Sequence, residues 1–368
     1  WERKKLGIYV PITMGQSPNS KNYTNNPRDN ILVQGNADLY NNRVLKRTFT
    51  TEVTKIADRN DILISVRAPV GDIARNQYES IVIGRGIAAI KGNNFLYYQL
   101  EKMNNSGFWK KYIAGSTFES ITGKDLKSSD IYISNHKEEK SIGDIFQTLT
   151  KTIQLHEDHL QFLHSFKSFL LQKMFFDNDI PPLLRFNKFT EKWNQCKLND
   201  HTIVTMGQSP NSKNYTNNQT GKILVQGNAD LYKNKILKRV FTTEVTKTAV
   251  KNDILISVRA PVGDIARNQY ESVVIGRGIA SIKGNDFLYY QLEKMKNNGF
   301  WNKYIAGSTF ESITGKDLKN TKIYTTNSDE ERKIGNIFSS LTKIIQLQEH
   351  KIDSLKKLKQ FLLQNMFI

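Results

Sequence analysis

The sequence predicts an α+β protein: two mixed, β-rich globular domains separated by two long helices, which form an antiparallel coiled coil with pseudo-two-fold symmetry. Three observations support this fold class. The second half of the 368-residue chain repeats the first at a shift of 192 residues. Each copy begins with short apolar runs between turn-forming residues. Each copy ends in a proline-free segment with apolar residues at heptad spacing.

The repeat is a whole domain unit. Residues 61–88, DILISVRAPVGDIARNQYESIVIGRGIA, return as residues 253–280 with one change, Ile81 to Val273. The two halves align without a gap, and the repeat of about 190 residues is far longer than a solenoid repeat. We therefore expect two equivalent structural units.

The first part of each copy has the pattern of a β-rich domain. The apolar runs at 31–33, 61–66 and 80–84 are bounded by Gly, Asn, Asp or Pro, which predicts strands. Residues 95–104, FLYYQLEKMN, predict a short helix. We expect the globular domains to cover 1–136 and 189–328.

The second part of each copy predicts a long helix, at 137–177 and at 329–368. A helix of about 37 residues is about 55 Å long, and its apolar seam needs a partner. The first seam register contains Ile142, Leu149, Leu163 and Leu170, and in the second copy Ile334, Leu341, Leu355 and Leu362. The second register contains Ile145 and Phe166, and in the second copy Ile337, Ile344 and Leu358. The polar residues His156 and Gln348 occupy the same seam position in the two copies.

The linker favours antiparallel pairing of these helices. Pro181 and Pro182 end the first helix within the linker 178–188. A parallel arrangement requires a return of about 55 Å, whereas about a dozen extended residues reach only about 40 Å. The second domain could cover the rest of that return, so parallel pairing stays open.

Charge and composition restrict the function. Lys and Arg number 53 against 35 Asp and Glu, giving a net charge of +18. This excess favours nucleic acid as the partner, with an anionic membrane surface second. No apolar stretch of about 18 residues predicts a membrane span, and no signal peptide is recognisable. The single Cys196 cannot form an internal disulfide, which favours a reducing cytoplasm.

The lead-in to Trp193 has no counterpart before Trp1, so we expect about ten native residues to precede this chain.

Several motifs together resemble a known family. The segments NDILISVRAPVGDIA, GRGIAAIKG and AGSTFESITGKDLK, followed by a helix ending in LQKMF, are similar to the specificity subunit of type I restriction–modification systems. LRFNKFTEKWNQCKL resembles that family's usual entry into a target-recognition domain. The motifs occur in order and twice, so the resemblance covers the whole chain.

The resemblance implies a DNA-recognition protein without catalysis of its own. It identifies 1–136 and 189–328 as target-recognition domains and 137–177 and 329–368 as conserved-region helices. In that family the helices bind two methyltransferase (modification) subunits, and restriction subunits join this core. S-adenosylmethionine would be bound by the partner methyltransferase, and no cofactor is expected in this chain. Each domain recognises one half of a bipartite site. Here the two domains are nearly the same, whereas family members usually carry two different ones.

Candidate DNA contacts come from residue chemistry. Lys and Arg can contact phosphates, whereas Asn, Gln and Arg can form bidentate contacts with bases. The loop MGQSPNSKNYTNN, present at 14–26 and again at 206–218, is the first candidate for base recognition. The predicted contacts are Gln16, Ser17, Asn19, Ser20, Lys21, Asn22, Tyr23, Asn36, Lys46, Arg47, Arg67, Arg75, Arg85, Ser116 and Thr117. Their counterparts are Gln208, Ser209, Asn211, Ser212, Lys213, Asn214, Tyr215, Asn228, Lys238, Arg239, Arg259, Arg267, Arg277, Ser308 and Thr309. Arg67 and Arg85 stand beside glycines that can equally serve turn geometry.

Enzyme and metal sites are not expected. Gly84-Arg-Gly86 lacks the helix-opening context of a dinucleotide fingerprint. The Glu138-Glu-Lys140 segment of the first copy has no lysine in its counterpart, where Arg332 stands. The histidines 156, 159 and 164 are replaced by Gln or Lys in the second copy, so they are not a metal site.

Near-identity of the two domains predicts a symmetric target. Two identical domains on antiparallel helices recognise the same half-site in inverted orientation, as symmetric dimers do on palindromic operators. The alternatives are a related specificity subunit of a methyltransferase-fused restriction system, a sequence-blind tandem-repeat nucleic-acid-binding protein, and a helical scaffold whose globular parts bind protein.

Overall fold

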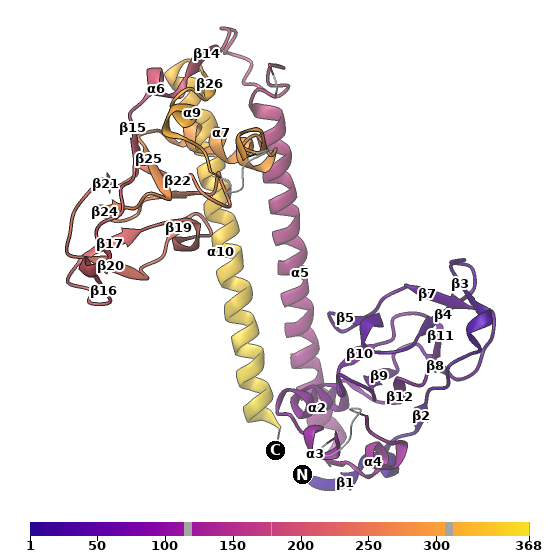
Figure 1. Ribbon diagram of the computed structural model, residues 1–368. Coiled ribbons are helices and arrows are strands. Elements are labelled where there is room, and N and C mark those ends of the chain that lie inside the picture. The colour runs from indigo at the N-terminus through magenta and orange to yellow at the C-terminus, as the bar shows by residue number, and fades with distance from the viewer. Residues whose placement is uncertain (114–119, 178, 306–311, 368) are drawn as a thin grey trace. The chain divides into compact units, whose positions relative to one another are not determined.

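A computed structural model describes residues 1–113, 120–177, 179–305 and 312–367. The chain forms two compact units. Unit 1 contains Trp1–Asp158 and His350–Ile368, and unit 2 contains His159–Glu349. The long helices α5 (His136–Met174) and α10 (Ser328–Met366) therefore each contribute to both units (Figure 1).

Unit 1 contains two sheets joined through a common core. The first has the strand order β2-β12-β9-β10-β6-β5 and the second the order β3-β7-β4-β11-β8. The strands of the first are Ile12–Met14, Ile87–Ile90, Ile62–Ser65, Ile73–Arg75, Arg43–Val44 and Leu39–Tyr40. Those of the second are Tyr23–Thr24, Thr48–Thr50, Asn30–Val33, Ser80–Ile83 and Ile56–Asp58. A separate pair joins β1 (Glu2–Lys5) to β13 (Asp130–Ile133).

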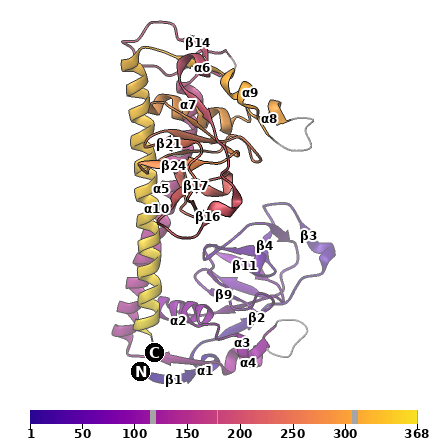
Figure 2. The same ribbon diagram turned by 60° about the vertical axis from the view of Figure 1, so that its left-hand side comes forward.

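Strand β9 explains the layering. Successive side chains of a strand point to opposite faces. Ile62 and Ile64 pack in the core that contains α2 (Asn94–Asn105), whereas Leu63 packs in a second core with residues of β11 and β12. Figure 2 shows β9 between α2 and β11. All four residues of β9 are buried, which accounts for the run of three apolar residues at 62–64 before the buried Ser65.

Short helices complete unit 1. They are α1 (Leu6–Tyr9), α3 (Lys110–Ile113), α4 (Gly123–Ser128) and the 3₁₀ turns η1 (Ser20–Asn22) and η2 (Asn36–Asp38). Helix α2 begins where the Asn93 side chain accepts a hydrogen bond from the Leu96 amide at 2.9 Å.

Unit 2 repeats this arrangement. Its sheets have the orders β15-β25-β22-β23 and β16-β20-β17-β24-β21, with β18-β19 and β14-β26 as separate pairs. Its strands are β14 (Asn194–Lys197), β15 (Val204–Met206), β16 (Tyr215–Thr216), β17 (Lys222–Val225), β18 (Leu231–Tyr232), β19 (Lys235–Ile236), β20 (Val240–Thr242), β21 (Thr248–Val250), β22 (Ile254–Ser257), β23 (Ile265–Arg267), β24 (Ser272–Ile275), β25 (Ile279–Ile282) and β26 (Lys322–Thr325). Its short helices are α6 (Leu198–His201), η3 (Ser212–Asn214), η4 (Asn228–Asp230), α7 (Asp286–Asn297), α8 (Asn302–Ile305) and α9 (Gly315–Lys319). The predicted strands and the predicted helix at 95–104 are confirmed.

The long helices run antiparallel within each unit. In unit 1 Phe146, near the start of α5, lies 5.5 Å from the ring of Phe367, directly after α10. In unit 2 Phe175, directly after α5, lies 5.6 Å from the ring of Phe338, near the start of α10. Each unit thus pairs the beginning of one helix with the end of the other, which confirms the predicted direction.

The second heptad register was wrong at four of its five positions, whereas Ile337 is half-buried and packs against the core of unit 2. Ile145, Phe166, Ile344 and Leu358 are 41–48% exposed. Phe146 and Ile153, and their counterparts Phe338 and Ile345, are buried instead. The reason is that each helix packs against a domain helix as well as against its partner. Tyr98 of α2, for example, lies 5.1 Å from Phe146, which rotates the buried stripe away from a simple two-helix seam.

A lysine donates hydrogen bonds to backbone carbonyl oxygens at the C-terminal end of each long helix. Lys102 Nζ of α2 donates to the Phe367 carbonyl oxygen at 2.8 Å. Its counterpart Lys294 donates to the carbonyl oxygens of Phe175 and Phe176. A cation there is favoured, since the last carbonyls of a helix carry partial negative charge.

Candidate nucleic-acid interface

Three segments of unit 1 lie against one another: 15–17, 34–36 and 84–86. The Gln16 amide donates to the Ile83 carbonyl at 2.9 Å, and the Gly84 amide to that of Val33 at 2.8 Å. A Cβ on Gly86 would lie 2.3 Å from the Gln34 carbonyl oxygen, which no larger residue can tolerate. The glycine beside Arg85 is therefore required for close approach of two backbones.

Two exposed arginines, Arg67 and Arg85, lie beside these segments. The Arg85 amide donates to Ser17 Oγ at 3.2 Å, which joins the turn 84–86 to the loop at 15–17. The Val66 amide donates to the Gly86 carbonyl at 2.9 Å, which brings the exposed Arg67 next to the same turn. Neither guanidinium forms an ion pair within the part of the chain that the structure describes. Both exposed side chains can therefore neutralise phosphates.

The predicted recognition loop is an ordered structure. Asn19 Oδ1 accepts the Lys21 amide at 3.2 Å and caps η1. Glu52 Oε2 accepts the Asn19 amide at 2.8 Å and the Asn22 side-chain amide at 2.7 Å. Tyr23 OH donates to Gln34 Oε1 at 3.2 Å. The loop is thereby attached both to residue 52 and to the segment 34–36.

Glu52 is held as a carboxylate. The hydrogen bonds from Asn22 and Asn19 lower its pKa below the usual value, and the nearby Lys21 lowers the pKa further. Thr54 Oγ1 donates to the Gln16 carbonyl at 2.5 Å, a second contact from the same segment. Sequence reasoning missed Glu52 and Thr54, because a search for DNA contacts selects basic and amide residues.

Unit 2 contains the same constellation. Glu244 Oε2 accepts the Asn211 amide and the Asn214 side-chain amide, both at 2.7 Å. The Arg277 amide donates to Ser209 Oγ at 3.1 Å, and Arg259 is exposed. Hydrogen bonds from Asn211 and Asn214 lower the pKa of Glu244. Sequence-predicted loop residues therefore occupy equivalent positions in both units.

Other predicted residues lie beside the segment 34–38 of unit 1 or its counterpart. Lys46 lies 4.5 Å from the centre of the Tyr78 ring. Arg47 Nη1 donates to the Ala37 carbonyl at 2.8 Å. Asn36 begins η2 and is half-buried. In unit 2, Lys238 lies over Tyr270, Arg239 bonds the Ala229 carbonyl, and Asn228 donates to Asp264.

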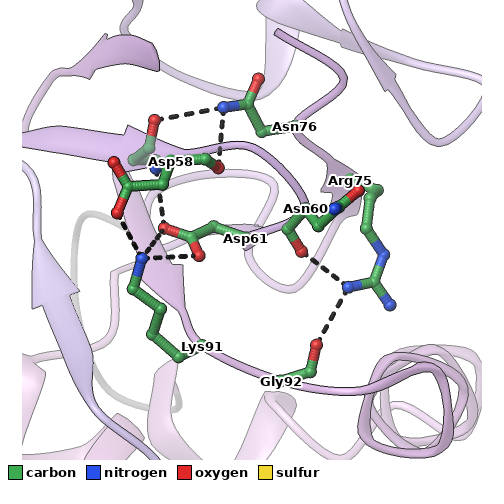
Figure 3. Close-up of polar contacts among 8 residues, drawn as sticks. Asp58, Asn60, Asp61, Arg75, Asn76, Lys91 and Gly92 are labelled. Atoms are coloured by element: carbon green, nitrogen blue, oxygen red, sulfur yellow. Dashed lines mark hydrogen bonds and ion pairs between the residues drawn. The ribbon is translucent and has the colours of Figure 1, made fainter. Parts of the chain in front are cut away.

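Arg75 is half-buried, and its guanidinium is bound by other parts of the domain. Its guanidinium donates to the carbonyls of Asn60 and Gly92 at 2.7 and 3.0 Å (Figure 3), and lies over the Tyr97 ring. Burial lowers the pKa of Arg75. Arg267 is placed in the same way and also pairs with Asp286. These donors are used within the domain, so we place Arg75 and Arg267 outside the proposed DNA surface.

The remaining predictions are not tested by these contacts. Ser116, Thr117, Ser308 and Thr309 lie outside the described residues. The DNA contacts named above stay predictions, since no nucleic acid is present.

Among the described residues there is no cluster of three His, Cys, Asp or Glu side chains able to hold a metal ion. No described helix is long and apolar enough to cross a membrane.

Comparison with known proteins identifies the family. A family model for the type I restriction modification DNA specificity domain matches residues 1–164 and again residues 190–357. The chain belongs to this family. The two matches correspond to the two copies of the repeat.

Two similar curated proteins are described as specificity subunits of type I restriction enzymes. The putative type I restriction enzyme MjaX specificity subunit of Methanocaldococcus jannaschii is 36% identical over 167 residues, which is 42% of this chain and 38% of that protein. The MjaIX specificity subunit of the same organism is 27% identical over 126 residues, 32% of this chain and 28% of that protein. The matches thus span well under half of each relative's length.

Solved structures share the fold of this specificity-domain family. The S subunit of a type I restriction–modification system from M. genitalium aligns over 100% of this chain and 96% of its own, with a TM-score of 0.70 and 16% identity. A chain from a structure of type I system assembly and conformational transition aligns over 99% and 96%, with a TM-score of 0.60 and 19% identity. At these identities the likeness shows the fold alone.

Proposed function

We propose that this chain is the DNA-recognition subunit of a type I restriction–modification complex and has no catalytic site of its own. One observation carries the proposal. The same loops, the same exposed arginines and the same glutamate contacts occur in both units. A protein with two such surfaces is suited to a target with two half-sites.

The chemistry divides between charge and base recognition. Arg67, Arg85 and Lys21 present exposed positive charge beside the loop, which suits contacts to phosphates. Gln16 and Ser20 present exposed polar groups from the loop itself, which suit hydrogen bonds to base edges. The net charge of +18 adds a long-range attraction to DNA.

We further propose that the two half-sites have the same sequence in inverted orientation. The near-identity of the two loops supports the same base sequence in both half-sites. The antiparallel direction of the helices supports inversion, because each unit pairs the start of one helix with the end of the other. Helix length then sets the number of unspecified base pairs between the half-sites.

The exposed helix faces suit docking of methyltransferase (modification) subunits. On α5 in unit 2, Phe162 and Phe166 stack at 6.0 Å and are 62% and 41% exposed. On α10 in unit 1, Leu358 and Phe361 are 46% and 60% exposed. Such apolar surface on an otherwise charged helix favours a protein partner. Restriction subunits would join the resulting core, S-adenosylmethionine would be bound by the methyltransferase, and the complex would act in the cytoplasm.

Selection from a random duplex pool tests the recognition step. The full chain, co-expressed with its modification subunit, is mixed with duplexes that contain a randomised central region, and the retained duplexes are sequenced. We expect a bipartite consensus. Retention of all duplexes without any consensus indicates a sequence-blind binder and contradicts the proposal. Failure to retain DNA at all indicates a protein scaffold and also contradicts it.

A further inference from the structure

We propose that Glu52 and its counterpart Glu244 are positioning residues that hold the recognition loops in the shape required for base selection. Gln16, Ser20 and Lys21, with their counterparts, are then the loop side chains left to contact DNA. This inference rests on the proposed function, because it assumes that the loops face DNA.

A single carboxylate oxygen organises the loop. Glu52 Oε2 accepts both the Asn19 amide and the Asn22 side-chain amide, at 2.8 and 2.7 Å. The preceding residue strengthens the attachment, since the Thr51 amide donates to the Asn22 carbonyl at 3.1 Å. Thr51 and Glu52, the two residues directly after β7, therefore hold both ends of η1.

This arrangement changes the role of two asparagines. Recognition of adenine by asparagine requires its amide N–H and its carbonyl oxygen together. Asn22 uses an amide N–H on Glu52, and Asn19 uses its carbonyl oxygen on the Lys21 amide. Neither side chain is free to turn toward a base as a donor–acceptor pair. Gln16, by contrast, has an exposed side chain without a hydrogen bond to any residue that the structure describes.

The charge of Glu52 gives the proposal a distinctive signature. A carboxylate on a surface that faces phosphates repels them, so it weakens sequence-independent binding. If it also orders the loop, its removal lowers base selection while total DNA binding stays equal or rises. A residue that merely stabilised the domain would lower both quantities together.

The test uses the full chain with its modification subunit and the random duplex pool. In the double variant E52A/E244A we expect base selection at the wild-type positions to fall by about tenfold, with total duplex retention unchanged or raised. E52Q/E244Q keeps an acceptor oxygen and should retain selection within about threefold. E79A/E271A is the matched control, because it removes the same charge from carboxylates that are 89% and 85% exposed.

The outcomes separate the inference from the proposed function. Wild-type selection with equally sharp selection by E52A/E244A overturns the positioning role and leaves DNA recognition intact. A wild-type chain that selects no consensus overturns both. If E52A/E244A unfolds, the variant N22A/N214A replaces it, because it removes the hydrogen bonds of Glu52 and Glu244 to the loop asparagines. Weaker base selection by N22A/N214A supports the positioning role of the glutamates. Unchanged base selection overturns it.

Discussion

Lys359 Nζ of α10 lies 2.8 Å from Glu101 Oε1 of α2, a contact between residues 258 positions apart in the chain. The counterpart in unit 2 joins Lys167 of α5 to Glu293 of α7 at 2.9 Å. Each pair connects a domain to a helix that begins in the other repeat. All four side chains are only 11–17% exposed. Each pair therefore opposes sliding of that helix along the domain.

Breaking this pair should destabilise unit 1. K359M leaves the Glu101 carboxylate nearly buried without its partner, and we expect a loss of about 2 kcal/mol. Urea unfolding of the full chain measures the loss. The exposed pair of Lys4 with Glu2, 38% and 68% exposed, provides the control, and E2Q should cost less than about 0.5 kcal/mol. Equal effects of K359M and E2Q would contradict the role of burial.

The aromatic end of each long helix should be essential for stability. Phe367 lies 5.2 Å from Phe95 and 5.5 Å from Phe146. F367A empties this site, which we expect to cost about 3–4 kcal/mol. F361A is the control on the same helix, since Phe361 is 60% exposed and its loss should change stability little. Thermal melting compares the two variants. If F361A were the more damaging, the packing described for unit 1 would be incorrect.

Arginine removal should change the salt dependence of DNA binding. R85A/R277A removes two exposed guanidiniums, and we expect the slope of log affinity against log salt to fall by about 2. Gel shifts between 50 and 200 mM salt, roughly the range in which counterion release is large, measure the slope. R59A/K251A is the control, because these side chains already pair with Glu79 and Glu271. An unchanged slope in R85A/R277A would remove both arginines from the phosphate-contacting set.

Matched shortening of the two long helices should change the number of base pairs between the half-sites and leave the base sequence of the half-sites unchanged. Deletion of residues 156–162 with 348–354 removes one heptad from each helix, about 10 Å or about 3 base pairs. We expect the consensus spacer to shorten by about that amount. Altered letters at an unchanged spacing would refute the role of the helices as a ruler.

The sequence predicted the strands and the long helices correctly, because apolar runs and heptad spacing reflect local periodicity. It failed where a distant residue decides the outcome. Ile145 looked like a seam residue, but packing of Tyr98 on Phe146 turned it toward solvent. Arg75 and Arg85 look alike in the sequence, yet carbonyls from other segments bind the half-buried Arg75 guanidinium, whereas Arg85 is exposed. Charge alone does not distinguish an arginine whose donors are used within the domain from one that is exposed.

Methylome sequencing of a host that carries this subunit and its modification subunit tests the central proposal most directly, with a host lacking this chain as control. It reports the letters and the spacing of both half-sites at once. We expect one bipartite motif whose two halves are the same sequence in inverted orientation, absent from the control. A motif with two unrelated halves, or with the same half in direct repeat, would contradict the account.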